Sequence, residues 1–229
     1  MRPRFVGHLG LADVITAINA AIGFLAIAAL TINIELTARL ILLAGIADAL
    51  DGLIARMRGG TAVGEYLDGL ADVASFGIAP AGLVFMSFQI RYVSFTLLDW
   101  ILILGVPAVY VMVVVIRLGL YTTYDTKNNH TIGVPSTLAG TILAVGLLVG
   151  IDYFILLIAT AIFIYLMVAP ITYPDLLPRD AFIMGLIQIG AVVRPQMSGL
   201  LFPKVLLIWA LAYLVLGPRF YWRNEGKRS

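Results

Sequence analysis

Cysteine is absent from this chain, and charge is scarce. The lack of cysteine excludes disulfide bonds, thiolate nucleophiles and cysteine-ligated iron–sulfur clusters. Asp, Glu, Lys and Arg make up 12% of the 229 residues, about half of the roughly 25% in a typical soluble domain. The net charge of +2 argues against nucleic acid as a partner, because binding to a phosphate backbone needs concentrated positive charge.

Apolar residues take the place of the missing charge. They make up 61% of the chain, and the mean hydropathy is +1.01. A membrane-spanning helix needs about 20 mostly apolar residues, and such stretches recur along the chain. The sequence predicts an all-α, polytopic membrane helix bundle, formed by residues 1–229 as a single domain, with six to eight transmembrane helices and eight favoured. The expected spans are 12–32, 38–56, 64–90, 99–119, 134–150, 152–169, 180–195 and 202–218.

The basic residues predict the orientation of these spans. The chain begins with a short basic tail, which we interpret as leading into the first span rather than as a cleaved signal peptide. With eight spans, eleven of the fifteen basic residues fall on the side of the two tails, and the positive-inside rule makes this side cytoplasmic. We therefore expect a multi-pass protein of the cytoplasmic membrane. The basic residues on this side are Arg2, Arg4, Arg56, Arg58, Arg117, Lys127, Arg179, Arg219, Arg223, Lys227 and Arg228.

Four aspartates interrupt the apolar pattern. On a helix, Asp48 and Asp51 are three residues apart and share a face. Asp68 and Asp72 are four residues apart and share a face in the same way. The glycine-rich turn 59–61 between the two pairs lets both helices run back to back, so that four carboxylates converge on the cytoplasmic side. Four unpaired carboxylates in a membrane could cost on the order of 10 kcal/mol, which predicts bound divalent cations.

The types of residue in this segment indicate the chemistry. A set of oxygen ligands without nearby His or Cys suits Mg²⁺ or Mn²⁺, and four carboxylates can hold two such ions. Paired ions favour an in-line displacement at phosphorus. Arg56 lies one turn beyond Gly52, where it could neutralise a phosphate oxygen. Ala55, Gly64 and Gly52 leave room for a bulky ligand. These residues predict metal-assisted phosphoryl-group transfer at the cytoplasmic face of the membrane.

Two other interpretations of the aspartates remain open. The four side chains could form a proton or cation pathway in a cation-coupled transporter, because acidic residues inside membranes often do. They could also be interfacial residues that extend to water. Arg56 and Arg58, considered alone, are typical of residues that determine membrane topology.

The aspartate segment resembles a known signature. The run Asp48-x2-Asp51-Gly52-x2-Ala55-Arg56, followed by Gly64-x3-Asp68-x3-Asp72, is similar to the signature of the CDP-alcohol phosphatidyltransferases. That family usually has eight residues between the arginine and the next glycine, and this chain has seven, 57–63. Residues 67–81 resemble the phosphatidylserine synthase branch through Ser75, Phe76 and Gly77. Residues 4–27 resemble the archaetidylserine synthases.

The resemblance implies a reaction and a set of roles. CDP-archaeol or CDP-diacylglycerol and L-serine would give archaetidylserine or phosphatidylserine and CMP. Two Mg²⁺ or Mn²⁺ ions would be held by Asp48, Asp51, Asp68 and Asp72. Asp72 would also act as the general base on the serine hydroxyl. The CDP pocket would be lined by Asn19, Gly52, Ala55, Arg56, Gly64 and Asp68.

The acceptor is predicted from charge. A phosphorylated acceptor, such as glycerol 3-phosphate or inositol phosphate, needs several basic residues near the site, and the later helices offer few. We therefore favour serine and keep a sibling transferase with a phosphorylated acceptor as the alternative. Arg117 is the candidate for binding the serine carboxylate, although it could equally anchor its helix at the interface. The expected partners are a CDP-lipid, L-serine and membrane lipids, and a homodimer is left open.

Overall fold

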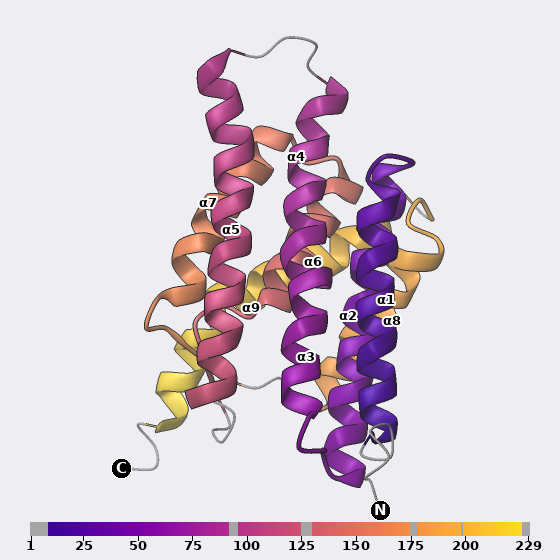
Figure 1. The fold of residues 1–229 in the computed structure, drawn as a ribbon, viewed down its shortest axis with the longest axis vertical. Coiled ribbons are helices and arrows are strands. Elements are labelled where there is room, and N and C mark those ends of the chain that lie inside the picture. The colour runs from indigo at the N-terminus through magenta and orange to yellow at the C-terminus, as the bar shows by residue number, and fades with distance from the viewer. Residues whose placement is uncertain (1–8, 92–95, 125–129, 175–177, 198, 226–229) are drawn as a thin grey trace, which may run out of the picture.

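The computed structural model describes residues 9–91, 96–124, 130–174, 178–197 and 199–225. In these ranges the chain forms helices and two short strands (Figure 1). The elements are α1 (Leu11–Ala29), α2 (Ile34–Arg58), α3 (Gly64–Asp72), the π-helical segment η2 (Val73–Ile78), α4 (Ala79–Arg91), α5 (Leu97–Tyr124), β1 (His130–Ile132), α6 (Ser136–Val149), α7 (Tyr153–Val168), β2 (Thr172–Pro174), α8 (Pro178–Val193) and α9 (Leu201–Glu225).

The predicted membrane helix bundle is confirmed. Four helical segments are long and apolar enough to cross a membrane, and three more are shorter apolar helices. The long ones are Leu11–Ala29, Gly64–Ile90, Leu97–Thr123 and Leu201–Pro218, and the shorter ones are Ser136–Val149, Tyr153–Val168 and Phe182–Val193. With α2, which carries two of the aspartates, the described part of the chain has the eight helical segments that the hydropathy pattern favours.

The first three helices determine where the aspartates lie. α2 ends at Arg58, and the next residue, Gly59, has a φ of +86°, which is rare for a residue with a side chain. The chain turns within residues 59–63, and α3 runs back antiparallel to α2. α1 packs against both α2 and α3. This turn lies at the same end of the bundle as the start of α1 (Figure 1). The two helices run back to back, as the sequence analysis predicted from the glycine-rich turn.

The helix that begins with α3 changes its hydrogen-bonding pattern directly after Asp72. Val73–Ile78 is π-helical, and Pro80 follows soon after it. Proline has no N–H, so the Phe76 carbonyl lacks its α-helical donor four residues on. The buried Tyr110 hydroxyl of α5 donates to this carbonyl at 2.9 Å. The sequence analysis did not predict this segment, because the apolar pattern continues through it unchanged.

α6 is the central helix of the bundle. Eleven of its fourteen residues are buried, and it contacts α2, α4, α7, α9 and η2. Small residues make this possible: an added Cβ at Gly140 would lie only 3.2 Å from side-chain atoms of Phe76 and Pro80. The close approach brings the N-terminus of α6 toward the aspartates.

The start of α6 is held by a short strand pair that the sequence did not predict. β1 and β2 pair antiparallel, with Thr131 opposite Tyr173. Directly after β1, the Gly133 N–H donates to the Ile171 carbonyl at 2.8 Å. Gly133 has a φ of +75°, and an added Cβ would collide with the Met167 carbonyl. Only glycine fits there, so this residue determines the entry into α6.

Candidate active site

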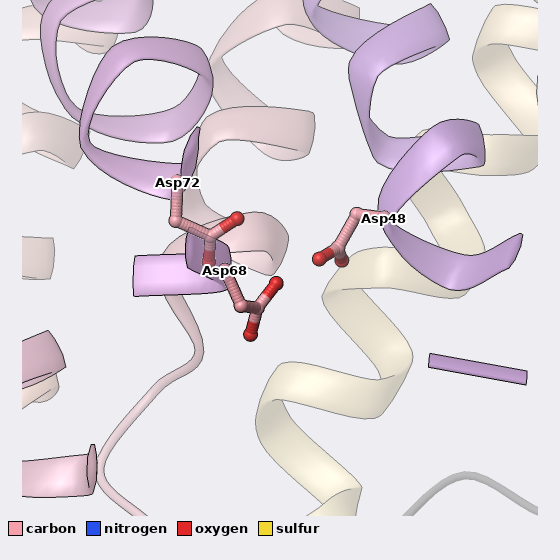
Figure 2. A group of neighbouring side chains, drawn as sticks. All are labelled: Asp48, Asp68 and Asp72. Atoms are coloured by element: carbon pink, nitrogen blue, oxygen red, sulfur yellow. The ribbon is translucent and has the colours of Figure 1, made fainter. Parts of the chain in front are cut away.

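Three of the predicted metal ligands meet between α2 and α3. Asp48 projects from α2, and Asp68 and Asp72 project toward it from α3 (Figure 2). One carboxylate oxygen from each residue lies within 4.8 Å of the other two. Asp72 is buried, and the other two side chains are half-buried. The helical spacing of four residues places the two α3 aspartates on one face, and the fold turns that face toward α2.

Asp51 lies beside this group rather than in it. It is 5% exposed and is near enough to act electrostatically on all three carboxylates of the group. On its other side it is close to Asp13 and Thr16 of α1. The structure therefore brings three of the four predicted ligands together and places the fourth between them and α1.

The donor set fits a hard divalent cation. In the described part of the chain, Oδ1 of Asp72 and Oδ2 of Asp51 are buried and have no hydrogen-bond partner. Buried carboxylate oxygens without donors are costly, and several negative charges at this spacing repel one another. A bound cation with oxygen ligands, such as Mg²⁺ or Mn²⁺, removes both penalties.

Two polar side chains from other helices approach Asp72. Ser136, the first residue of α6, donates its hydroxyl to Oδ2 of Asp72 at 3.4 Å. Arg117 of α5 is 7% exposed and acts electrostatically on the same carboxylate. Its guanidinium carbon lies 5.8 Å from the centre of the Tyr121 ring. The acceptor-binding candidate is thus buried next to the carboxylate that is the candidate general base.

The predicted CDP-binding residues lie on α1, α2 and α3. Gly52 and Ala55 are half-buried on α2, and Arg56 is exposed one turn beyond Gly52. An added Cβ at Gly52 would meet nothing within 4 Å, so the space beside it is open. Gly64 begins α3, and Asn19 is fully buried on α1.

The comparison with known families decides the identity of this site. The sequence model of the CDP-alcohol phosphatidyltransferases matches residues 9–171, which include α1 to α7 and all the site residues described above. The chain belongs to the CDP-alcohol phosphatidyltransferase family. The predicted resemblance is therefore confirmed, and the family identity favours an enzyme over the cation-coupled transporter.

Relatives of this phosphatidyltransferase carry related names. An archaetidylserine synthase from Methanothermobacter thermautotrophicus is 29% identical over 181 residues, which cover 75% of this chain and 72% of the relative. A CDP-diacylglycerol–serine O-phosphatidyltransferase from Methanocaldococcus jannaschii is 31% identical over 175 residues, covering 76% and 77%. The protein of the same name from Saccharomyces cerevisiae is 36% identical over 106 residues, covering 40% and 38%.

The phosphatidyltransferase site contains residues that the sequence analysis missed. Asp13 is 2% exposed and accepts hydrogen bonds from the Gly10 N–H at 2.7 Å and from the Thr61 hydroxyl at 2.8 Å. An added Cβ at Gly64 would lie 3.2 Å from its carboxylate. Asp13 therefore ties the turn between α2 and α3 to α1. The sequence did contain a signal for Asp13, because an aspartate at the start of an apolar membrane span is unusual.

Ser136 was missed for a different reason. It lies near the start of the predicted span 134–150, where it looks like an ordinary residue of an apolar helix. Nothing in its local pattern indicates that a helix beginning 64 positions after Asp72 places its first residue against that aspartate. The turn at Gly133 directs the chain into α6 and so allows the contact.

Proposed function

We propose that this phosphatidyltransferase transfers the lipid phosphoryl group of CDP-archaeol or CDP-diacylglycerol to the hydroxyl of L-serine and releases CMP. The observation that carries the proposal is the convergence of Asp48, Asp68 and Asp72 beside the buried Arg117. The names of the archaeal relatives support serine as the acceptor.

In the proposed step, the serine hydroxyl oxygen forms a bond to the phosphorus that carries the lipid. The bond that breaks joins this phosphorus to the oxygen that bridges it to CMP, so CMP leaves with that oxygen. Asp72 takes the hydroxyl proton on its carboxylate. Ser136 donates to Oδ2 of that carboxylate and so keeps it oriented.

Asp48, Asp51, Asp68 and Asp72 would hold two divalent cations, Mg²⁺ or Mn²⁺. When bound, these ions neutralise the diphosphate and stabilise the charge that develops on the departing CMP. Asp48 and Asp68 are only half-buried, so a diphosphate could reach their carboxylates. Because the donor set has only carboxylate oxygens, it also selects against zinc and copper.

The nucleotide would lie along α1 and the end of α2. The exposed Arg56 can pair with a diphosphate oxygen, and the open space beside Gly52 and Ala55 accepts the bulk of the nucleotide. Asn19 offers hydrogen-bonding groups from α1. Asp68 lies four residues into α3, about 6 Å from its start, so the water-soluble headgroup of a CDP-lipid can reach the site at the end of the bundle that carries the α2–α3 turn. We propose that this end faces the cytoplasm.

Arg117 would bind the carboxylate of serine. A carboxylate that enters a partly dehydrated site needs a partner, because a buried unpaired charge is costly. Among the residues whose burial the structure describes, Arg117 is the one basic side chain that is buried. One cation matches an amino acid better than it matches a phosphate monoester, whose double negative charge calls for several.

The acceptor assay tests the proposal directly. Purified protein in lipid vesicles receives the CDP-lipid, Mg²⁺ and one radiolabelled acceptor at a time: L-serine, glycerol 3-phosphate or inositol phosphate. We expect labelled lipid and an equal amount of CMP with serine. If a phosphorylated acceptor labels the lipid and serine does not, then serine is not the acceptor and the protein is a sibling transferase that uses the phosphorylated acceptor. Absence of both lipid labelling and CMP release with every acceptor would overturn the proposed reaction.

A variant series tests the role of Arg117. Arg117→Ala should raise the serine KM about tenfold, or about 1.4 kcal/mol, with little change in the KM for the CDP-lipid. Arg117→Lys, which keeps the charge, should recover part of the loss. Arg39→Ala is the control, since Arg39 lies on α2 away from the site and donates to the Val192 carbonyl at 2.6 Å. Equal changes in both KM values would return Arg117 to an anchoring role.

A further inference from the structure

A buried hydrogen bond connects α1 to the π-helical segment η2. The Ser75 hydroxyl lies 2.9 Å from Oδ1 of Asn19 and 3.1 Å from the Asn19 backbone carbonyl. Both side chains are fully buried. Since both of these oxygens are acceptors, the hydroxyl donates its proton and is shared between them. Because the hydrogen bond holds the amide oxygen of Asn19, it also sets the orientation of the whole side-chain amide.

The other end of this amide has no partner. Nδ2 of Asn19 is buried and has no hydrogen-bond partner within the described residues. A buried amide that leaves its donors unsatisfied is costly, and a ligand that supplies the acceptor removes this cost. Asn19 lies on the buried face of α1 that also carries Thr16, and Thr16 is close to Asp51. The amide is therefore on the face of α1 that lines the aspartate site.

The close approach of η2 to α1 depends on a glycine. An added Cβ at Gly23 would lie 2.6 Å from the Ser75 hydroxyl oxygen and 3.0 Å from its backbone nitrogen. No side chain fits there without moving η2, so Gly23 lets Ser75 reach Asn19. The π-helical winding after Asp72 also contributes, because the changed number of residues per turn redirects the side chains that follow.

We propose that Ser75 is a positioning residue for the nucleotide: it holds the Asn19 amide so that the NH₂ group donates to the CMP portion of the CDP-lipid. This inference rests on the proposed function, because it assumes that the site takes a CDP-lipid. CMP offers acceptors of the required kind on its base, ribose and phosphate. Ser75 itself touches no substrate and acts through Asn19.

Binding of CMP to the purified protein with Mg²⁺, measured by calorimetry, tests the proposal without an acceptor or turnover. Ser75→Ala should weaken CMP binding about tenfold, which corresponds to the loss of one well-oriented hydrogen bond to a ligand. In steady-state assays the KM for the CDP-lipid should rise by a similar factor, with the serine KM unchanged. A purely structural role would instead lower stability and affect both substrates alike.

Ser87→Ala is the matched control. Ser87 is also a buried serine on the helix that continues from η2, but its hydroxyl donates to the Leu83 carbonyl one turn back, at 2.7 Å. This variant should bind CMP like the wild type. Gly23→Ala, which presses on the Ser75 hydroxyl from α1, should weaken CMP binding as Ser75→Ala does.

A double-mutant cycle assigns the effect to Asn19. Asn19→Ala should weaken CMP binding at least as much as Ser75→Ala, and adding Ser75→Ala to it should cause no further loss. Additive losses would mean that Ser75 acts independently of Asn19 and would overturn the proposal. If Ser75→Ala does not fold, Ser75→Cys, which is similar in size and a weaker donor, takes its place.

The outcomes separate this inference from the proposed function. If the wild type binds CMP and Ser75→Ala or Ser75→Cys binds it equally well, the positioning role is wrong and the proposed transferase reaction stands. If the wild type neither binds CMP nor releases it from a CDP-lipid, the proposed function itself is wrong, and the inference is lost with it.

Discussion

Replacing Tyr110 by phenylalanine removes one hydroxyl from the bundle, and its cost can be worked out from the structure. That hydroxyl donates to the Phe76 carbonyl at 2.9 Å, and both side chains are fully buried. The carbonyl has no α-helical donor because residue 80 is proline. Leaving a buried acceptor unsatisfied costs about 1–3 kcal/mol. We expect Tyr110→Phe to lower the free energy of unfolding by this amount.

The proline makes the prediction specific. Pro80→Ala supplies an N–H at the position where an α-helix would donate to Phe76. In the Pro80→Ala background, Tyr110→Phe should therefore cost clearly less than in the wild type. Pro80→Ala also loses the packing of the ring against Gly140, but the double-mutant cycle cancels this loss because it is present in both backgrounds.

Equilibrium unfolding in mixed micelles, followed by tryptophan fluorescence, measures the four variants of the cycle. Tyr213→Phe is the control: its hydroxyl donates to the Pro174 carbonyl at 2.6 Å, away from η2, so its cost should not depend on Pro80. A cost below about 0.5 kcal/mol for Tyr110→Phe, or an equal cost in both backgrounds, would refute the reasoning about the Phe76 carbonyl.

Three further predictions concern the site itself. Asp68→Asn and Asp72→Asn should each abolish turnover while the protein still folds and inserts, and more than about a tenth of wild-type activity in either would contradict the two-cation site. EDTA should inactivate the enzyme and Mg²⁺ or Mn²⁺ should restore it, whereas full activity at a confirmed metal content of nil would exclude the mechanism. Thr61→Val should destabilise the fold by about 1–3 kcal/mol, because the hydroxyl donates to the Asp13 carboxylate at 2.8 Å. Thr61→Ser keeps this donor and should have the free energy of unfolding of the wild type. If the two variants have the same free energy of unfolding, the hydrogen bond does not stabilise the fold.

The polar contacts between helices could not be predicted from the sequence. Thr61 and Asp13 are 48 positions apart, Ser75 and Asn19 are 56 apart, and Ser136 and Asp72 are 64 apart. Helical periodicity says which residues share a face, but it does not say toward which neighbour that face is turned. The π-helical turn and the strand pair were missed as well, since neither changes the apolar pattern.

The sequence by itself determined the helices and the faces on which the aspartates lie. Hydropathy is a local property, and the spacings of three and four residues place carboxylates together on any α-helix. Only the tertiary structure decided that Asp48 meets the α3 aspartates while Asp51 turns toward α1. The physical reason is close packing: Gly23 and Gly140 let α1 and α6 approach η2. The relative depth and rotation of packed helices follow from such contacts between distant residues.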